Sequence, residues 1–296
     1  FHLNENASLL KRGVQNVMVV LPKMEGEDGF YFRGIWEGIK KTAEGLSRSH
    51  FQFRYMEVDY RLDEISQALA KVYDEEADNI QGLITVSDNQ EANVWAASFG
   101  RMGIPTVLIS SYKEKAKNVY SVKVNHDKAG KLAGEFLYHT LRGKPGKVLV
   151  LTGNTDIYSN RKYVTAFLNY MREHCDWLDM VCVPGFGAEN IDVSVRQALE
   201  GENFIGAFIC NARNTMQFCK IAEDYDQCRD MIVVGTDVFH ELSPYFENGV
   251  LTASIYQCNR EQGSRAVGML QELLSGTEKP EAVEEMPIGL VMKYNY

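Results

Sequence analysis

The hydrophobic and polar positions alternate between two patterns along most of the chain. Short apolar runs, of which Val17–Leu21 is the first, predict buried strands. The segments between them, such as Tyr31–Gly45, carry apolar residues at helical spacing and predict amphipathic helices. Because a helix between two successive strands gives a crossover connection, this alternation predicts parallel sheets.

The pattern predicts the following elements. The strands are Val17–Leu21, Phe51–Val58, Leu83–Val86, Pro105–Ile109, Tyr120–Val124, Val148–Leu151, Met180–Val183, Ala207–Cys210, Met231–Gly235, Leu251–Ile255 and Ile288–Met292. The helices are Tyr31–Gly45, Leu62–Glu76, Gln90–Phe99, Lys128–Leu141, Arg161–His174, Ile191–Leu199, Met216–Tyr225, Leu242–Asn248 and Glu261–Leu274. Pro280 and Pro287 bracket a predicted loop before the last strand.

The rhythm of strands and helices begins again near the middle of the chain. A length of 296 residues is sufficient for two domains of about 100–150 residues each. We therefore predict an α/β protein with two doubly wound, Rossmann-like lobes joined by a hinge. The predicted division is 1–13 as a linker, 14–124 with 256–284 as one lobe, and 125–255 with 285–296 as the other.

The composition indicates a soluble globular protein. The chain is 45% hydrophobic and 24% charged, which is ordinary for such proteins. It contains no apolar run long enough to cross a membrane, and no secretory leader is visible. We expect a cytoplasmic protein without a membrane partner. A mature secreted protein would also have lost its leader, so the periplasm stays open.

The net charge bears on nucleic-acid binding, and the cysteine positions bear on the redox state of the protein. A net charge of −9 argues against nucleic-acid binding by this part of the protein alone, because phosphate contacts need clustered Lys and Arg. The six cysteines are confined to the second half and form no Cys-x-x-Cys pair. Reduced, buried thiols in the cytosol are the expected state, with disulfides as the alternative.

Signatures of catalysis and of cofactor binding are missing from the sequence. No G-x-G-x-x-G or G-x-S-x-G occurs. Gly143–Lys147 lacks the Ser or Thr of a phosphate-binding loop and precedes a strand, and His240-Glu241 lacks the second His of a zinc helix. We expect no enzyme, no cofactor and no metal site.

Polar residues gather just past the carboxyl ends of the predicted strands, where doubly wound sheets bind ligands. These segments are Glu25–Phe32, Ser87–Gln90, Ser110–Tyr112, Asn154–Tyr158, Asn211–Asn214, Thr236–Asp237 and Tyr256–Gln257. A sugar needs both kinds of side chain that they contain: carboxylates, amides and Arg for its hydroxyls, and an aromatic plane for its C–H face. The alternative is that loops at strand ends are simply polar.

Three motifs resemble the type I periplasmic-binding-protein fold, which sugar-binding transport proteins share with the effector cores of lac-repressor-family (LacI/GalR) regulators. Tyr31-Phe32 with Gly38-Ile39 resembles the aromatic pair after the first strand. Val124–Gly130 resembles the crossover motif. Val234–Asp237 with Ser254–Gln257 resembles the closing signature, in which the Asp and the Gln contact ligand.

The chain departs from that family pattern in two places. Tyr163 occupies the position where the family often has a sugar-gripping Arg, and Arg161 lies nearby. Ala212 replaces a frequent Asp after Asn211, followed by Arg213. Fewer acids together with Arg213 lead to the hypothesis of an acidic or otherwise unusual ligand.

The first thirteen residues resemble the hinge of the same regulators, which joins a helix-turn-helix headpiece to the effector core. Ala7, Leu10 and Lys11 fall on the hinge pattern, and Leu10 would be the apolar wedge that enters the DNA minor groove. Asn4 or Asn6 could cap this short helix and Gly13 could end it. The alternative is a frayed N-terminal tail.

The resemblance implies the ligand-sensing and dimerisation core of a LacI-type regulator. Its expected partners are a sugar-like effector, operator DNA through a headpiece outside this sequence, and a second copy in a homodimer. The ligand is expected to bridge the lobes, and the candidate ligand-binding residues are Tyr31, Phe32, Asp88, Asn89, Ser110, Asn125, Tyr158, Arg161, Asn211, Arg213, Asp237 and Gln257. The alternative is a periplasmic sugar-binding protein of an ABC transporter or sensor system.

Overall fold

The computed structural model describes residues 13–27, 29–46, 50–59, 63–87, 89–110, 116–185, 188–277 and 280–296. The chain divides into two compact units. The first unit comprises Phe1–Lys123 and Asn259–Met286, and the second comprises Val124–Cys258 and Pro287–Tyr296. The chain therefore passes from one unit to the other three times.

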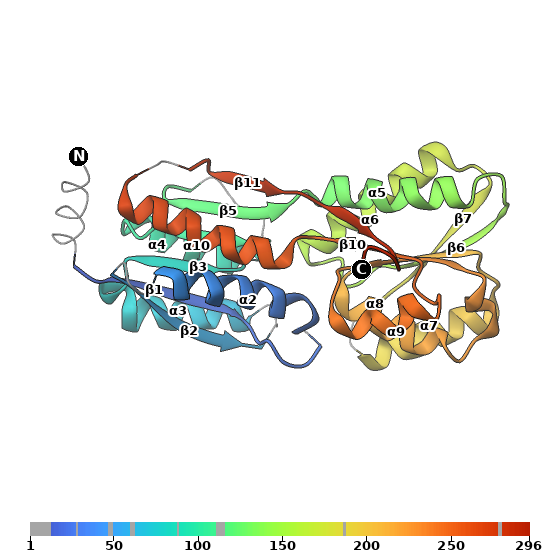
Figure 1. The fold of residues 1–296 in the computed structure, drawn as a ribbon, viewed down its shortest axis with the longest axis horizontal. Helices are drawn as coiled ribbons and strands as arrows, with labels where there is room; N and C mark the ends of the chain where they lie inside the picture. The colour runs from blue at the N-terminus through green and yellow to red at the C-terminus, as the bar shows by residue number, and fades with distance from the viewer. Residues whose placement is uncertain are drawn as a thin grey trace. The chain divides into compact units, whose positions relative to one another are not determined.

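The first unit is built on a six-stranded sheet in the order β11-β5-β4-β3-β1-β2 (Figure 1). Strands β1 to β5 pair in parallel with their neighbours. The strands are β1 (Gln15–Pro22), β2 (Phe51–Val58), β3 (Gly82–Thr85), β4 (Thr106–Ile109), β5 (Val119–Val124) and β11 (Val283–Met286), and the helices are α2 (Gly29–Leu46), α3 (Glu64–Glu76), the short η1 (Ala77–Asn79), α4 (Gln90–Arg101) and α10 (Asn259–Ser275).

The second unit repeats this plan, with a six-stranded sheet in the order β12-β10-β9-β8-β6-β7. All its pairings are parallel except that of β12 with β10. Its elements are β6 (Gly146–Leu151), β7 (Leu178–Val183), β8 (Gly206–Ile209), β9 (Ile232–Thr236), β10 (Ala253–Tyr256), β12 (Gly289–Val291), α5 (His126–Thr140), α6 (Tyr158–His174), α7 (Ala188–Gly201), α8 (Ala212–Ala222), η2 (Asp226–Arg229), η3 (His240–Leu242) and α9 (Ser243–Glu247).

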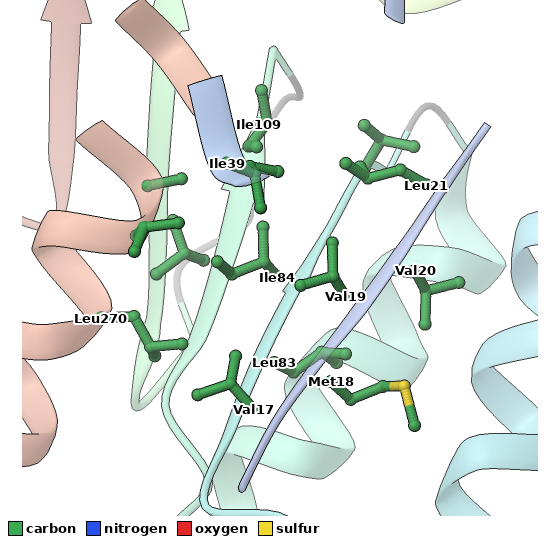
Figure 2. Packing of buried hydrophobic residues seen from close by; sticks show 14 of the residues in the cluster. Val17, Met18, Val19, Val20, Leu21, Ile39, Leu83, Ile84, Ile109 and Leu270 are labelled. Atoms are coloured by element: carbon green, nitrogen blue, oxygen red, sulfur yellow. The ribbon is translucent and has the colours of Figure 1, made fainter. Parts of the chain in front are cut away.

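Strand β1 lies in the middle of the core of the first unit, because helices cover both faces of a parallel sheet. Every residue of Val17–Leu21 is at most 4% exposed. Figure 2 shows Val17 and Val19 on the side of Ile39 and Leu270, and Met18 and Val20 on the opposite side. Burial of one such side chain contributes about 1.5–3 kcal/mol, so this short strand is a major source of stability.

Glycines let helices α2 and α10 of the first unit approach each other closely, and the two helices lie side by side in Figure 1. A Cβ at Gly38 would lie 2.0 Å from the carbonyl oxygen of Arg260, and one at Gly263 would lie 2.1 Å from that of Ile35. The second unit has an equivalent contact between α5 and α6, where a Cβ at Gly130 would lie 2.3 Å from the carbonyl oxygen of Tyr163. No larger residue fits at these three positions without moving backbone.

The predicted fold class is confirmed: the protein consists of two α/β units with mainly parallel sheets. One element was predicted wrongly, since the expected loop before Pro287 contains β11. Its sequence, Val-Glu-Glu-Met, has the charge of a loop. The strand nevertheless forms at the sheet edge, where Arg265 of α10 binds both carboxylate oxygens of Glu284 at 2.8 Å.

The borders of the two units also differ from the predicted ones. The expected passage after Ile255 lies after Cys258 in the structure, and the expected passage after Glu284 lies after Met286. The physical reason for the first difference is that Gln257 is bonded to Asp237 of the second unit. The predicted linker is largely outside the described residues, which include Gly13 (φ +69°) but not Ala7, Leu10 or Lys11.

Two further features concern the described part of the chain. None of its helices combines the length and the hydropathy that crossing a membrane requires. The six cysteines are free, and all but Cys182 are buried.

We expect Gly38→Ala to destabilise the first unit strongly, because the new methyl group would collide with the Arg260 backbone rather than with a movable side chain. Overpacking of this kind costs about 1–3 kcal/mol or more. The matched control is Gly45→Ala in the same helix, where nothing lies within 4 Å of the new Cβ. That change should stabilise by about 0.5–1 kcal/mol through helix propensity. Denaturant unfolding of both variants tests the contact, and equal effects would contradict it.

Candidate functional site

Backbone strain marks the carboxyl ends of the strands. Among the described non-glycine residues, positive φ angles at strand exits occur at Ser110 (+54°) after β4, Asn211 (+71°) after β8, Asp237 (+70°) after β9 and Cys258 (+53°) after β10. Such conformations are costly and collect at functional sites. Three of these four residues are among the predicted ligand-binding residues, so the strand ends are the candidate site in each unit.

In the first unit the structure brings together two predicted residues, Tyr31 and Ser110. Tyr31 lies in the first turn of α2, and its hydroxyl donates a hydrogen bond of 2.5 Å to Ser110 Oγ. The Ser110 N–H donates to the carbonyl of Val122 at 2.9 Å, which ties the strained residue to β5. A half-buried phenol therefore stands at the end of β4 with its orientation fixed.

The neighbouring predicted residue, Phe32, has a different position. It is 4% exposed and belongs to the hydrophobic core. Its ring meets the Tyr31 ring edge-on, with the centroids 5.0 Å apart. Phe32 thus supports Tyr31 from the core side and does not present an open face at the strand ends.

Asn89 serves as a helix cap in the structure. Its side-chain oxygen accepts a hydrogen bond from the Ala92 N–H at 2.7 Å at the start of α4, which satisfies an otherwise unpaired backbone donor. The same oxygen accepts from Ser66 Oγ at 3.3 Å. Asp88, the residue before it, lies outside the described residues.

Asn259, which the sequence analysis did not single out, adds a polar group beside Tyr31. Its amide nitrogen donates to the Tyr31 carbonyl at 3.2 Å. The residue is 5% exposed, and its side-chain oxygen is buried without a hydrogen-bond partner. Such an atom is unusual in a folded protein and indicates an acceptor that can receive an external donor.

In the second unit the structure brings together Asp237 and Gln257, as the closing signature implies. The amide of Gln257 donates to the Asp237 carboxylate at 2.9 Å, and Asp237 is 1% exposed. The Asp237 backbone is held on both sides: its N–H donates to Ile255 O at 2.9 Å, and its carbonyl accepts from Ser254 Oγ at 2.5 Å. This pairing exists because β9 and β10 are parallel neighbours that end together.

Asn211 combines a helix cap with strong backbone strain. Its side-chain oxygen accepts from the Asn214 N–H at 3.0 Å at the start of α8. Its φ and ψ angles, +71° and 159°, fall in a region that essentially only glycine adopts. Gly153, which follows β6, lies close to Asn211. A Cβ on Gly153 would be 2.7 Å from the side-chain amide nitrogen of Asn211.

The second unit also buries the side chains of Thr236, Cys210 and Tyr163. The Thr236 hydroxyl donates to Ile209 O at 2.7 Å, and Cys210 Sγ lies 3.7 Å from the side-chain oxygen of Asn160. Burial raises the pKa of the Cys210 thiol and of the Tyr163 hydroxyl far above their usual values, and the Asp237 charge raises both further. Both groups are therefore neutral at physiological pH.

The remaining predicted residues are spread over helix starts. Asn125 caps α5 through the Lys128 N–H at 3.0 Å. Arg161 is exposed and donates to the carbonyl of Thr155 at 2.9 Å, with its guanidinium 5.8 Å from the Tyr158 ring. Arg213 is half-buried in the first turn of α8.

Buried acceptors and neutral donors make these strand ends suitable for binding hydroxyl groups. A carboxylate and amides of fixed orientation can bond hydroxyls, and the low local dielectric strengthens each bond. Over the described ranges, no group of three or more His, Cys, Asp or Glu side chains is placed to hold a metal ion. The buried acceptors and donors at these strand ends are suited to hydrogen bonding with a polar organic molecule.

Substitution of Asn211 by glycine should leave the free energy of unfolding unchanged or raise it by up to about 2 kcal/mol. Relief of the backbone strain, about 1–3 kcal/mol, outweighs the weaker cap and the greater freedom of the unfolded chain. Asn211→Ala keeps the strain and loses the cap, so it should lower stability by about 1–2 kcal/mol. Urea unfolding measures both, and an equal loss in the two variants would show that the conformation is not strained.

Comparison with known proteins assigns the chain to one family and finds solved structures with a similar fold. The family described as periplasmic binding protein domain matches residues 18–278. No functionally curated protein sequence matches the chain.

Three solved structures illustrate the likeness of fold. A glucose–galactose binding protein from Geobacillus stearothermophilus is 19% identical, with a TM-score of 0.81 over 95% of this chain and 98% of that one. An ABC transporter solute-binding protein from Burkholderia graminis, in complex with D-arabinose, is 15% identical, with a TM-score of 0.84 over 96% and 97%. A proposed LacI transcriptional regulator from Bacteroides fragilis is 17% identical, with a TM-score of 0.82 over 95% and 98%.

Proposed function

Because the chain belongs to the periplasmic binding protein domain family, we propose that it binds a sugar or a similar polyhydroxylated molecule without transforming it. The observation that carries this proposal is the buried Asp237–Gln257 pair at the ends of β9 and β10. Burial of a carboxylate, here 1% exposed, is costly unless hydrogen bonds compensate for the lost water. The bond from Gln257 fixes the direction of the Asp237 carboxylate, which can then accept a hydrogen bond from a ligand hydroxyl.

The strained backbone supports the same proposal. Positive φ angles occur at Asp237, Asn211 and Ser110. A glycine at any of these three positions would adopt such an angle without strain. Strain of this kind persists at sites where the side chain is required in that position. The candidate contacts in the first unit are Tyr31 and Ser110, and in the second unit Asp237 and Gln257.

The comparisons favour the class of solute-binding proteins. The Geobacillus protein is named for binding glucose and galactose, and the structure of the Burkholderia solute-binding protein is a complex with D-arabinose. We therefore propose, as the first candidate, that the chain is the sugar-binding component of a transport or sensor system.

The second candidate is the ligand-sensing core of a LacI-type regulator, which would couple ligand to operator DNA as a homodimer in the cytoplasm. It is favoured by the hinge-like residues Ala7, Leu10 and Lys11 directly before β1 and by the likeness to the Bacteroides structure. The six free cysteines favour it as well, because free thiols are typical of reducing compartments.

We expect Asp237→Asn to weaken sugar binding by about 10- to 100-fold, since a hydrogen bond to a charged group contributes about 1.5–3 kcal/mol. Isothermal titration with glucose, galactose, D-arabinose and myo-inositol measures the effect. The control is Asp230→Asn, which removes an exposed carboxylate of the same unit and should leave affinity unchanged. Failure of every sugar and polyol to bind the wild-type protein would refute the proposal.

A gel-shift assay with the full-length gene product separates the two candidates. Sequence-specific DNA binding that responds to the ligand supports the regulator. Ligand binding without any DNA binding supports the solute-binding protein.

A further inference from the structure

We infer that Tyr296 is a positioning residue for ligand binding: it bonds to residues 238–242, here called the Asp237 turn, and so holds the Asp237 backbone in the conformation that ligand binding uses. This inference rests on the proposed ligand-binding function and deepens it. It extends the site of the second unit to a residue that lies outside the strand ends.

The residues that follow β12 have a defined structure. Asn295 closes a turn, because its side-chain oxygen accepts from the Met292 N–H at 2.6 Å and its own N–H donates to the Met292 carbonyl at 3.1 Å. Lys293 forms an ion pair with the Glu247 carboxylate at 3.0 Å, at the end of α9. The backbone turn and the ion pair thus direct Tyr296 toward the chain between β9 and α9, within the same unit.

Tyr296 contacts the Asp237 turn and its surroundings with both parts of its side chain. The hydroxyl donates to two consecutive carbonyls, Phe239 at 3.0 Å and His240 at 3.1 Å, which is a shared hydrogen bond. The ring lies beside that of Phe246, with the centroids 4.9 Å apart, and Phe246 is buried. This side chain therefore connects the segment after β12 to the Asp237 turn.

The Asp237 turn directly follows a strained residue. Asp237 has a φ of +70°, and a residue keeps such a conformation only where the surrounding structure over-determines it. The Asp237 N–H and carbonyl are bonded to Ile255 and Ser254 of β10. Two residues further along the chain, Tyr296 binds the Phe239 carbonyl. Since β12 pairs with β10, both constraints lead back to the same part of the sheet and hold Asp237 between them.

Hydrogen bonds within the Asp237 turn do not provide this second constraint. The Phe239 carbonyl also accepts from the Leu242 N–H at 3.0 Å, and the His240 carbonyl accepts from the Ser243 N–H. These bonds join residues only three apart, so they define the shape of the turn and not its place against the sheet. A carbonyl has a second lone pair, and Tyr296 uses it to tie the turn to a distant segment.

The first test is hydrogen–deuterium exchange of the ligand-free protein. Tyr296→Phe keeps the ring and removes the hydroxyl, so the backbone N–H groups of residues 237–242 should exchange about two- to tenfold faster. The effect is modest because Tyr296 is 43% exposed, and its bond competes with water. The matched control is Tyr294→Phe, whose hydroxyl belongs to a side chain that is 96% exposed, and which should not change exchange. Wild-type exchange rates in Tyr296→Phe would overturn the inference.

The second test is affinity, measured by isothermal titration with the sugar that binds the wild-type protein most tightly, at a temperature where all variants are folded. Tyr296→Phe should weaken binding by about two- to tenfold. Tyr225→Phe is the control for a purely structural loss, because its hydroxyl is bonded to Glu200 Oε1 at 3.1 Å in the same unit. It should at most lower the melting temperature and leave affinity unchanged.

The outcomes separate this inference from the proposed function. If Tyr296→Phe loses only melting temperature and binds the sugar as tightly as the wild type, the role of Tyr296 is structural, and the inference falls while sugar binding stands. If none of the sugars or polyols binds the wild-type protein, both proposals fall.

Discussion

The constraint on which the rest of this structure depends is the way its parallel strands end. Strands such as β1 are buried on both faces over most of their length, so charged side chains are expected mainly where the strands stop. At four of these exits a non-glycine residue turns the chain with a positive φ angle, and the side chain is then held at the edge of the sheet. The Asp237–Gln257 pair is the clearest result, because the parallel register of β9 and β10 places the two residues together.

At the carboxyl ends of the strands, the features that suit ligand binding lower the stability of the fold. The sheets and the close helix pairs, with Gly38, Gly263 and Gly130 at their contacts, provide the rigid frame. That frame keeps features that weaken the fold locally: a buried carboxylate, strained backbone, and a side-chain oxygen of Asn259 without a partner. Natural proteins tend to violate local rules at functional sites and to compensate elsewhere. The concentration of such violations at strand ends is the physical argument for a binding site.

Much of the fold was predictable from the sequence, because hydrophobic periodicity determines which segments are buried. The missed strand β11 depends on a contact of Glu284 with Arg265 that no local pattern reveals. The site was harder to predict, since the residue after a strand is also the residue before a helix. Asn89, Asn125 and Asn211 were predicted as ligand side chains, and the structure shows that their oxygens also cap α4, α5 and α8. Asn259 belongs to none of the predicted segments, and only the structure shows it bonded to the Tyr31 carbonyl with a buried, unpaired side-chain oxygen.

The most direct test of the account is a crystal structure of the protein with the neutral sugar that binds most tightly. The account predicts a sugar hydroxyl within hydrogen-bond distance, about 2.5–3.0 Å, of the Asp237 carboxylate. A sugar bound elsewhere, or a structure in which the Asp237 carboxylate contacts only water or protein groups, would contradict it.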